Sequence, residues 1–467
     1  MQRGGNTRGR EVGLTSVVLH PREQRRTTTK VGSKVEVKEK VLDEDDGYLD
    51  AEVDDEQQRL FSNLDVETLQ HQPGSVLGSV SLVAGTTVGA GILALPAVTA
   101  GTGYLPSSAV ILGCWAYSCV TGLLLAEVNL FLMCELGRGG VSMLSMAEDT
   151  FGGPGRILAG TTYVFLHYSL LVAYISRGGE LISGIADFSP ALASVAFGSL
   201  LGVTIYASNP SVLDRVNTAL VGGVVLSFFG ILAVAFGKFD ASQLGHADVG
   251  RVMSCVPVVA LSFVFHNIVP TVTSSLEGDR RKITTAIVAG TTIPLVMFLL
   301  WNAAILGYNL DGSDAADGSI LDPLKVLEED ATVGTYIMSF SLLAVATSFI
   351  GFVLGLVDFI ADGLNMPVNT KSLVPFSLTL VPPALFAVVY PDAFLSALEY
   401  AGTYGVLALF GVLPAAMAWK IRERKDLGVA DVPSLVPGGV PMLVVVGGAA
   451  LGVITQQTLI NLGGTQF

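Results

Sequence analysis

The sequence has few charged residues for its length. Asp, Glu, Lys and Arg make up 14% of the 467 residues, against about 25% in an average soluble domain. Hydrophobic residues make up 51%, and from Pro73 onwards they form many runs longer than the roughly 18 residues that mark a membrane-spanning helix. This excludes a water-soluble domain for most of the chain. We expect an all-α polytopic membrane protein embedded in a lipid bilayer.

Cysteine is also scarce, and its spacing excludes a metal centre. The four cysteines lie in apolar segments without a Cys-x-x-Cys pair, as is usual for small buried apolar residues. Basic residues form no extended cluster, so we expect no nucleic-acid partner. The signatures His-Glu-x-x-His and Gly-x-Ser-x-Gly are missing too. We therefore expect neither an enzyme nor a resident cofactor or metal.

Residues 1–72 differ in composition from the rest. Up to Val35 they are rich in Arg and Thr, with Glu11 and Glu23 as the acidic residues, and the acidic run Asp43–Glu56 follows. Two interpretations stay open, a disordered cytosolic tail or an organelle transit peptide. The housing membrane is accordingly the plasma membrane or an organelle membrane such as that of a chloroplast.

The apolar runs predict about eleven membrane-spanning helices. Residues 73–236 would hold helices 1–5, residues 252–419 helices 6–10, and residues 438–461 an additional helix 11. The expected spans are Gly74–Val98, Leu105–Cys134, Ile157–Ala186, Leu192–Ala207, Val216–Phe236, Val252–Leu276, Ile283–Leu306, Gly334–Ile360, Leu373–Val389, Phe394–Trp419 and Val440–Ile460.

The basic residues of the connecting loops support this count and indicate an orientation. With the N-terminus on the cytoplasmic side, the loops on the opposite side hold only Lys238, Arg251 and Lys325. Such a bias is expected from the positive-inside rule. The basic residues of the cytoplasmic loops are Arg138, Arg156, Arg215, Arg280, Arg281, Lys282, Lys371, Lys420, Arg422, Arg424 and Lys425.

The first span contains a segment, Val83–Pro96, that is poorly suited to a helix. Gly85, Gly89 and Gly91 each weaken a helix by about 1 kcal/mol. In lipid, an interrupted helix leaves backbone N–H and C=O groups without partners, so the interruption must face protein, water or a ligand. A discontinuous membrane helix of this kind is typical of a transporter binding site.

The sixth span carries a second weak point. Pro270 cannot donate to the helix and clashes with the preceding turn, and His266 and Asn267 place polar groups beside it. Because the two weak helices are five spans apart, the second set of five would be inverted relative to the first. We expect an inverted five-plus-five repeat with discontinuous helices 1 and 6. A proline kink beside a buried histidine is the alternative.

Three stretches at these places carry a family resemblance. They are Gly85–Pro96 continuing to Gly103, Ser262–Pro270 leading into Leu276–Lys282, and Thr347–Phe359. In order and spacing they resemble the aromatic amino acid permease family (tyrosine/tryptophan-specific transport proteins) of the amino acid–polyamine–organocation superfamily, and plant and algal members most. The resemblance covers most of residues 74–460. It implies eleven spans, the inverted repeat, and secondary active symport of aromatic amino acids with protons by alternating access.

A zwitterionic amino acid needs donors for its carboxylate and acceptors for its ammonium group, and an interrupted helix offers both. We expect substrate contacts from the first span at Gly85, Thr86, Thr87, Gly89, Ala90 and Gly91. In the sixth span we expect them at Phe263, Phe265, His266 and Asn267. For the threonines the alternative is a hydrogen bond back to their own helix. For the phenylalanines it is ordinary core packing.

Placing an ionisable side chain at the bilayer centre costs roughly 3 kcal/mol of free energy, so the few that are present in the spans are candidates for a structural or functional role. Arg177 and Glu180 are three residues apart and can pair. Candidates for ion coupling are Glu127, His266, Thr347, Ser348 and Asp358. The carboxylates and the histidine would carry a proton. The two hydroxyls would instead suit Na⁺ beside carbonyls of the first span, as in related transporters.

The sequence thus favours a proton-coupled transporter of tyrosine or tryptophan. A sodium-coupled or broader neutral amino acid transporter stays open. So does a sensor on the same fold that binds an amino acid without moving it, although no output domain is recognisable. The partners that follow are a small-molecule amino acid and the bilayer. The oligomeric state cannot be read from the sequence.

Overall fold

The computed structural model describes residues 74–136, 141–186, 188–308, 323–328, 333–364, 366, 372–426 and 432–463. All of these belong to one compact unit, residues 54–467. The described part is almost entirely helical, with one isolated antiparallel bridge between Phe239 and Tyr308. Residues 1–72, with the predicted tail or transit peptide, lie outside the described residues.

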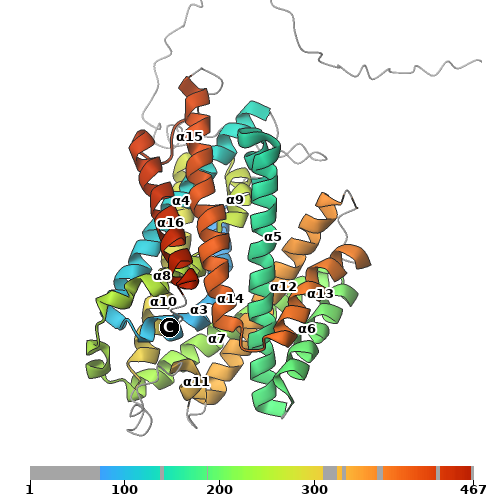
Figure 1. Ribbon diagram of the computed structural model, residues 1–467, viewed down its shortest axis with the longest axis vertical. Helices are drawn as coiled ribbons and strands as arrows, with labels where there is room; N and C mark the ends of the chain where they lie inside the picture. The colour runs from blue at the N-terminus through green and yellow to red at the C-terminus, as the bar shows by residue number, and fades with distance from the viewer. Residues whose placement is uncertain are drawn as a thin grey trace, which may run out of the picture. The chain divides into compact units, whose positions relative to one another are not determined.

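The helices follow one another along the chain in the colour order of Figure 1, which labels most of them. They are α2 (Val76–Thr87), α3 (Gly91–Ala100), α4 (Tyr104–Leu136), α5 (Met143–Ala186), α6 (Pro190–Ala207), α7 (Pro210–Ala235), α8 (Val252–Ser262), α9 (Val269–Ser275), α10 (Arg280–Leu306), α11 (Pro323–Glu328), α12 (Gly334–Gly363), α13 (Leu373–Val389), α14 (Phe394–Tyr400), α15 (Leu413–Asp426) and α16 (Gly439–Leu462). A π-helix, η6 (Ala401–Val412), joins α14 to α15, and a short 3₁₀ turn, η4 (His266–Ile268), precedes α9.

Each predicted span overlaps a helix or an interrupted helix. In the described residues nine helices are long and apolar enough to cross a membrane, and the bent pair α2–α3 would make a tenth. The apolar α13 has 17 residues and is shorter than that group. The all-helical architecture is therefore as expected, while the count of eleven and the inverted repeat stay predictions.

The outer surface of this bundle is apolar, as a membrane protein requires. Leu226 is 76% exposed, Leu200 67% and Leu459 65%, on three different helices. Water-soluble proteins rarely leave such large apolar surfaces open. With the number of long apolar helices, this surface establishes an integral, multi-pass membrane protein.

Local sequence signals account for the helix boundaries. Ser75 caps α2 by accepting the Gly78 N–H at 2.9 Å, and Asp279 caps α10 by accepting the Lys282 N–H at 3.0 Å. Within α5 the backbone of Gly152 turns to φ 71°, a left-handed conformation that glycine adopts readily. The helix is interrupted there, ahead of Pro154.

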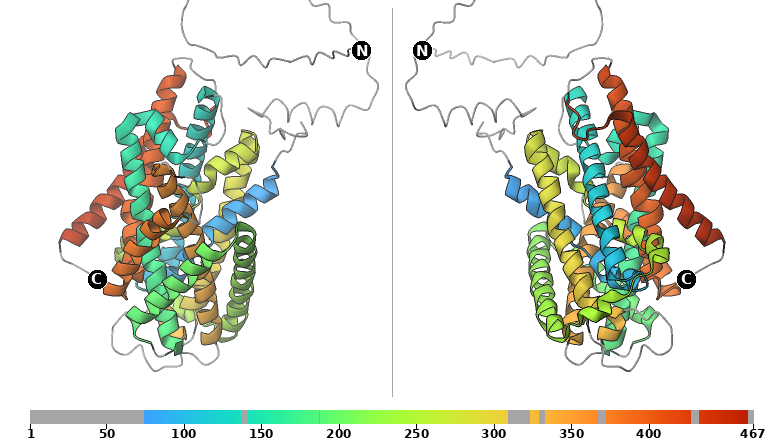
Figure 2. Two further views of the ribbon diagram at one scale, coloured as in Figure 1. Left: turned by 90° about the vertical axis from the view of Figure 1, so that its right-hand side faces the viewer. Right: turned by 90° about the vertical axis from the view of Figure 1, so that its left-hand side faces the viewer.

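The two interrupted spans, α2–α3 and α8–α9, pack against each other and against neighbouring helices. The first break packs through α2 against α10 and through α3 against α8, while the long α5 packs against α6, α12, α13 and η6. In Figure 2 the blue α2 runs obliquely from the edge of the bundle towards its middle. The two breaks are thereby held inside the bundle rather than towards lipid.

Candidate functional site

The first break separates α2 from α3 by a bend of 53°. α2 ends at Thr87, Val88 is extended with φ −78° and ψ 92°, and α3 begins at Gly91. The interruption that the glycines predict is therefore present. Thr86 and Thr87 donate their hydroxyls to the carbonyls of Leu82 and Val83, at 2.8 and 2.7 Å. Their side chains thus bond back to their own helix, which was the alternative to direct substrate donation.

The break leaves backbone groups without hydrogen-bond partners. In the described part of the chain, the N–H groups of Gly89 and Gly91 have no acceptor, and the carbonyls of Gly85, Thr86 and Thr87 have no donor. The Ala90 N–H between them donates to Ser348 Oγ of α12 at 2.9 Å. The break therefore offers two amide donors at the start of α3 and three carbonyl acceptors at the end of α2.

The second break lies directly beside the first. α8 ends at Ser262, and Phe263 to Phe265 connect it to η4 and then to α9, which has Pro270 near its start. A Cβ placed on Gly91 would lie 2.9 Å from Ser262 Oγ and 3.2 Å from Ser262 Cα. Glycine at position 91 therefore allows the two interrupted helices to touch at their breaks.

A cavity of about 440 Å³ lies at this meeting point, and we call it the central cavity. Its lining includes seven predicted residues of the two breaks and both predicted hydroxyl residues of α12. They are Gly85, Thr86, Thr87, Gly89, Ala90, Gly91, Asn267, Thr347 and Ser348. The sequence therefore locates most of one wall of the cavity.

A second cavity of about 880 Å³, which we call the vestibule, is lined by Asp358 and Asp362 of α12. It shares four residues with the central cavity, Tyr163, Asn267, Gly355 and Phe410, and we call these four the throat. The vestibule also reaches Met143 and Ser275, at helix ends that the predicted orientation places on the cytoplasmic side. Asp358 is thus separated from the central cavity by the throat.

The two aromatic residues expected in the pocket lie elsewhere. Phe263 is fully buried and packs edge-on against Phe298, with ring centroids 5.0 Å apart. Phe265 is also fully buried, and its ring fills the space left by the missing side chain of Gly122. Neither lines the central cavity. Both take part in core packing, which was the alternative interpretation.

His266 is buried behind the throat rather than in the cavity lining. Its ring is stacked between Phe265 and Phe410, with centroids 4.7 and 4.8 Å away, and Nε2 lies 2.8 Å from Thr121 Oγ1. Of these neighbours only Phe410 lines a cavity. The structure thus brings Asn267, but not His266, into contact with the candidate site.

Glu127 has a partner that its local sequence does not show. Its carboxylate is fully buried and accepts two hydrogen bonds from Arg422 of α15, each 2.9 Å long, and one from the Leu435 N–H at 3.0 Å. It lines neither the central cavity nor the vestibule. The predicted pair is present in α5, where Arg177 Nη1 lies 2.7 Å from Glu180 Oε2; Arg177 also pairs with Glu328 of α11.

Sequence reasoning missed the opposite wall of the central cavity. This wall is formed mainly by one face of α5 and by the part of α12 around Phe352. The α5 residues are Tyr163, Leu166, His167, Leu170 and Tyr174. Their spacing of three or four residues is the signal of a single helix face. That signal was available, but an apolar face with interspersed aromatics is equally typical of ordinary helix packing.

Comparison with known proteins decides the family. The sequence model of the tryptophan/tyrosine permease family matches residues 72–456. The chain belongs to the tryptophan/tyrosine permease family. The membership confirms the resemblance read from the three motifs, and with it the prediction of a membrane transporter rather than an enzyme.

Named permeases are similar over most of their length. "Tyrosine-specific transport system 1" of Haemophilus influenzae is 31% identical over 401 residues, which cover 81% of this chain and 94% of that protein. The "Tryptophan-specific transport protein" of the same organism is 29% identical over 384 residues, 76% of this chain and 90% of that protein. The match therefore spans whole permeases, not a shared fragment.

A solved structure shares the fold of this permease. The manganese transporter of Eremococcus coleocola superposes with a TM-score of 0.52 at 13% sequence identity, over 87% of this chain and 93% of that one. At this identity the likeness concerns the fold alone. In the described part of this permease, no three His, Cys, Asp or Glu side chains are grouped as a metal site would require.

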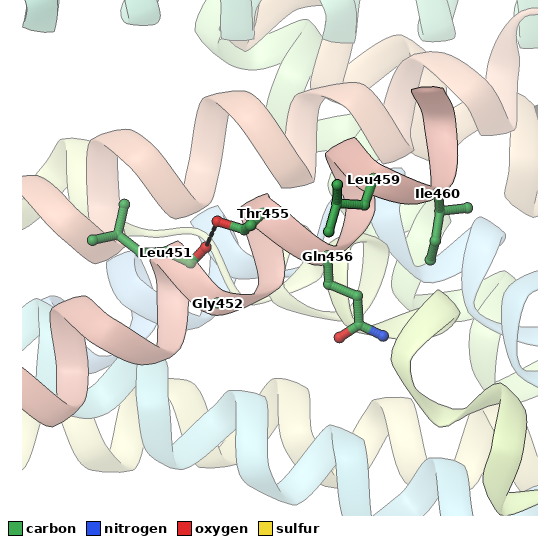
Figure 3. Close-up of a pocket in the computed structure, with 6 residues that line it drawn as sticks. All are labelled: Leu451, Gly452, Thr455, Gln456, Leu459 and Ile460. Carbon is green, nitrogen blue, oxygen red and sulfur yellow. Dashed lines mark hydrogen bonds between the residues drawn. The ribbon is translucent and has the colours of Figure 1, made fainter. Parts of the chain in front are cut away.

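A further hollow of about 630 Å³ lies on the outer face of α16 (Figure 3). All six of its lining residues come from that one helix, and the hydroxyl of Thr455 donates to the carbonyl of Leu451 at 2.7 Å. An apolar surface of this kind suits contact with lipid. It offers no converging polar groups, so the central cavity remains the candidate site.

Proposed function

We propose that this chain is a secondary active transporter that carries aromatic amino acids, tyrosine or tryptophan, by alternating access. The observation that supports this most is the cavity of about 440 Å³ at the meeting point of two interrupted helices. Paired interruptions are the usual site of substrate binding in such transporters. The names of its relatives favour an aromatic substrate.

The break in the first span suits the common head group of an amino acid. A carboxylate would accept from the unpaired N–H groups of Gly89 and Gly91, at the positive end of the α3 dipole. The ammonium group would donate to the carbonyls that end α2, among them that of Thr87. These groups belong to the backbone, so they recognise any amino acid, and discrimination has to come from the opposite wall.

The coupling ion is proposed to be the proton, with Asp358 as its carrier. Asp358 lies in the vestibule, beyond the throat, where it can meet water from one side of the membrane. Protonation would remove a charge that is costly inside the bilayer. Glu127 suits this role less, because Arg422 and the Leu435 N–H already hold its carboxylate.

Sodium coupling is the second candidate, and one observation favours it. Thr347 and Ser348 line the central cavity next to the first break, and Ser348 Oγ lies 2.9 Å from the Ala90 nitrogen. Oxygen ligands from two adjacent elements are what a hard cation requires. Because Ser348 Oγ already accepts the hydrogen bond from the Ala90 N–H, it has one lone pair fewer with which to bind a cation.

Proteoliposomes holding the full chain test both points. We expect labelled tyrosine or tryptophan to accumulate inside when a pH gradient is imposed, and a protonophore to abolish this. Accumulation that needs a Na⁺ gradient instead would replace the proton by sodium. Binding of the amino acid without gradient-driven accumulation under either condition would support the sensor and overturn the transporter. Competition by apolar aliphatic amino acids would indicate the broader neutral range.

A further inference from the structure

His167 of α5 lines the central cavity, and its two ring nitrogens differ: within the described residues, Nδ1 is hydrogen-bonded to the backbone, whereas Nε2 is not. The residue is 5% exposed and lines the cavity. Its Nδ1 lies 2.9 Å from the carbonyl oxygen of Tyr163. A carbonyl oxygen can only accept, so Nδ1 carries the hydrogen. The tautomer is thereby set by the backbone of the preceding turn.

The other nitrogen, Nε2, has no hydrogen-bond partner among the residues that the structure describes. It faces Gly355 of α12: a Cβ placed there would lie 3.7 Å from His167 Nε2 and 3.6 Å from the Tyr163 hydroxyl. No described carboxylate oxygen lies within 4.0 Å of either ring nitrogen to balance a positive charge. Since a buried cation without a partner is costly, the ring is neutral and Nε2 is an acceptor.

Aromatic rings surround this acceptor. Tyr163 lies on one side of the His167 ring with centroids 3.9 Å apart, and Phe352 on another at 5.1 Å. Tyr174 meets the edge of Phe352 at 5.7 Å. These flat surfaces suit an aromatic side chain, because ring pairs prefer offset or edge-to-face contacts at such separations.

The acceptor lies one substrate length away from the head-group site. Ser348, which touches the first break, and Gly355, which faces His167, are seven residues apart on α12. At 1.5 Å per residue this separation is about 10 Å along the helix axis. An extended aromatic amino acid has a comparable length from its carboxylate to the far edge of its ring.

We propose that His167 Nε2 accepts a hydrogen bond from the ring of the substrate, from the phenol O–H of tyrosine or the indole N–H of tryptophan. His167 then sets the specificity of the site against phenylalanine, which has the same ring but no donor. This inference rests on the proposed function. A buried acceptor left without its donor is penalised, and sites of this design reject the analogue that lacks the group.

The test is a competition profile of the full-length protein in proteoliposomes, with labelled tyrosine as the probe. Two matched pairs of unlabelled competitors differ only in the donor: tyrosine with phenylalanine, and tryptophan with 3-benzothienylalanine, in which sulfur replaces the indole N–H. For the native chain we expect the donor compounds to compete at concentrations lower by roughly tenfold or more, the factor for one hydrogen bond.

Three variants locate the effect. Each pair gives one ratio, the half-inhibiting concentration of the compound without the donor divided by that of the compound with it. His167→Leu should bring both ratios close to one, because tyrosine and tryptophan compete less well while competition by phenylalanine changes by less than about twofold. His167→Gln keeps an acceptor oxygen and should retain part of the discrimination. His246→Leu makes the same change at an exposed histidine that contacts the Gly101 carbonyl, and should leave both ratios as they are.

A ratio near one in the native chain, or an unchanged ratio in His167→Leu, would overturn the assignment. So would an equal loss for all four competitors, which a merely structural histidine would cause. Thermal stabilisation of the purified protein by the same compounds gives the ratios without transport. If the native protein accumulates no aromatic amino acid, the transporter proposal fails. The His167 assignment is then decided by thermal stabilisation alone. Stabilisation by tyrosine but not phenylalanine that is lost in His167→Leu would support the assignment, and the same stabilisation persisting in the variant would refute it.

Discussion

The Ala90 N–H donates a hydrogen bond of 2.9 Å to Ser348 Oγ, which ties the break in the first helix to α12. The bond fixes the middle residue of the interruption, so that the free N–H groups of Gly89 and Gly91 on either side are held in place. It also connects the proposed head-group site to α12, the helix that carries Phe352, Gly355 and Asp358. In the proposed mechanism, substrate at the break and the charge of Asp358 in the vestibule would therefore act on the same helix, α12.

Ser348→Ala should weaken substrate binding, because the Ala90 N–H loses its acceptor and the break loses its anchor. An unmade hydrogen bond of a buried group costs about 1–3 kcal/mol, so we expect the half-saturating tyrosine concentration to rise by about tenfold or more. Ser339→Ala is the matched control, since that exposed hydroxyl of α12 bonds, among the described residues, only to the carbonyl of Thr335, at 2.7 Å. Equal effects of the two substitutions would remove the special role of Ser348.

Two glycines of the break should respond differently to the same substitution. A Cβ on Gly85 meets no atom within 4 Å, so Gly85→Val should fill the central cavity and abolish uptake without loss of thermal stability. At Gly91 the side chain would collide with Ser262 of α8, so Gly91→Val should lower both uptake and stability.

Gly113→Val provides the control for these glycines. Gly113 lies on the outer face of α4 with nothing within 4 Å of its Cβ position, so the Gly113→Val variant should keep its uptake.

Near-normal uptake by Gly85→Val would remove Gly85 from the site. A stable but inactive Gly91→Val would mean that its contact with α8 can relax and that its effect lies in substrate binding.

Glu127→Gln should destabilise the fold rather than uncouple transport. Arg422 is 13% exposed as a side chain and would lose a charged partner; removing one member of a buried pair costs about 3 kcal/mol or more. The measurement is thermal unfolding of the purified protein, next to Glu148→Gln in the exposed pair with Arg156, for which we expect less than about 1 kcal/mol. Loss of gradient coupling with unchanged stability would restore Glu127 as a coupling residue.

Asp358→Asn should weaken gradient coupling more than substrate binding. The substitution keeps the size of the side chain and removes its charge and its proton, while the central cavity stays as it is. We expect exchange of labelled tyrosine across the membrane to continue and accumulation under a pH gradient to fall at least about tenfold. Asp392→Asn, in the exposed connection before α14, controls for loss of negative charge. If exchange and accumulation fall together, Asp358 has no special part in coupling.

Much of this fold is readable from the sequence because a bilayer imposes strict rules. Apolar runs must be helices, and glycine and proline within them mark where the helix is broken, as at Gly85–Gly91 and around Pro270. The position of Ser348 of α12 beside the first break followed from the family resemblance, whereas the Thr347 hydroxyl bonds back to the Ala344 carbonyl of its own helix. These rules operate over a few turns of chain, which is why they locate the two helix breaks.

The remaining parts depend on contacts between distant segments. Glu127 forms an ion pair with Arg422, which is 295 residues away in the sequence. No local sequence pattern predicts that pair. Phe263 and Phe265 lie in the break itself, where the helical period that would tell which way a side chain faces is lost. His167 could not be recognised for another reason: a histidine on an apolar helix face is commonly a packed core residue, and its place in the lining of the central cavity appears only in the structure.

A structure determined with tryptophan bound tests the central claim most directly. We predict its carboxylate within hydrogen-bond distance of the Gly89 and Gly91 nitrogens, its ammonium group at the carbonyls that end α2, and its ring between α5 and Phe352. Tryptophan bound away from the first break, for instance wholly within the vestibule next to Asp358, would contradict the account.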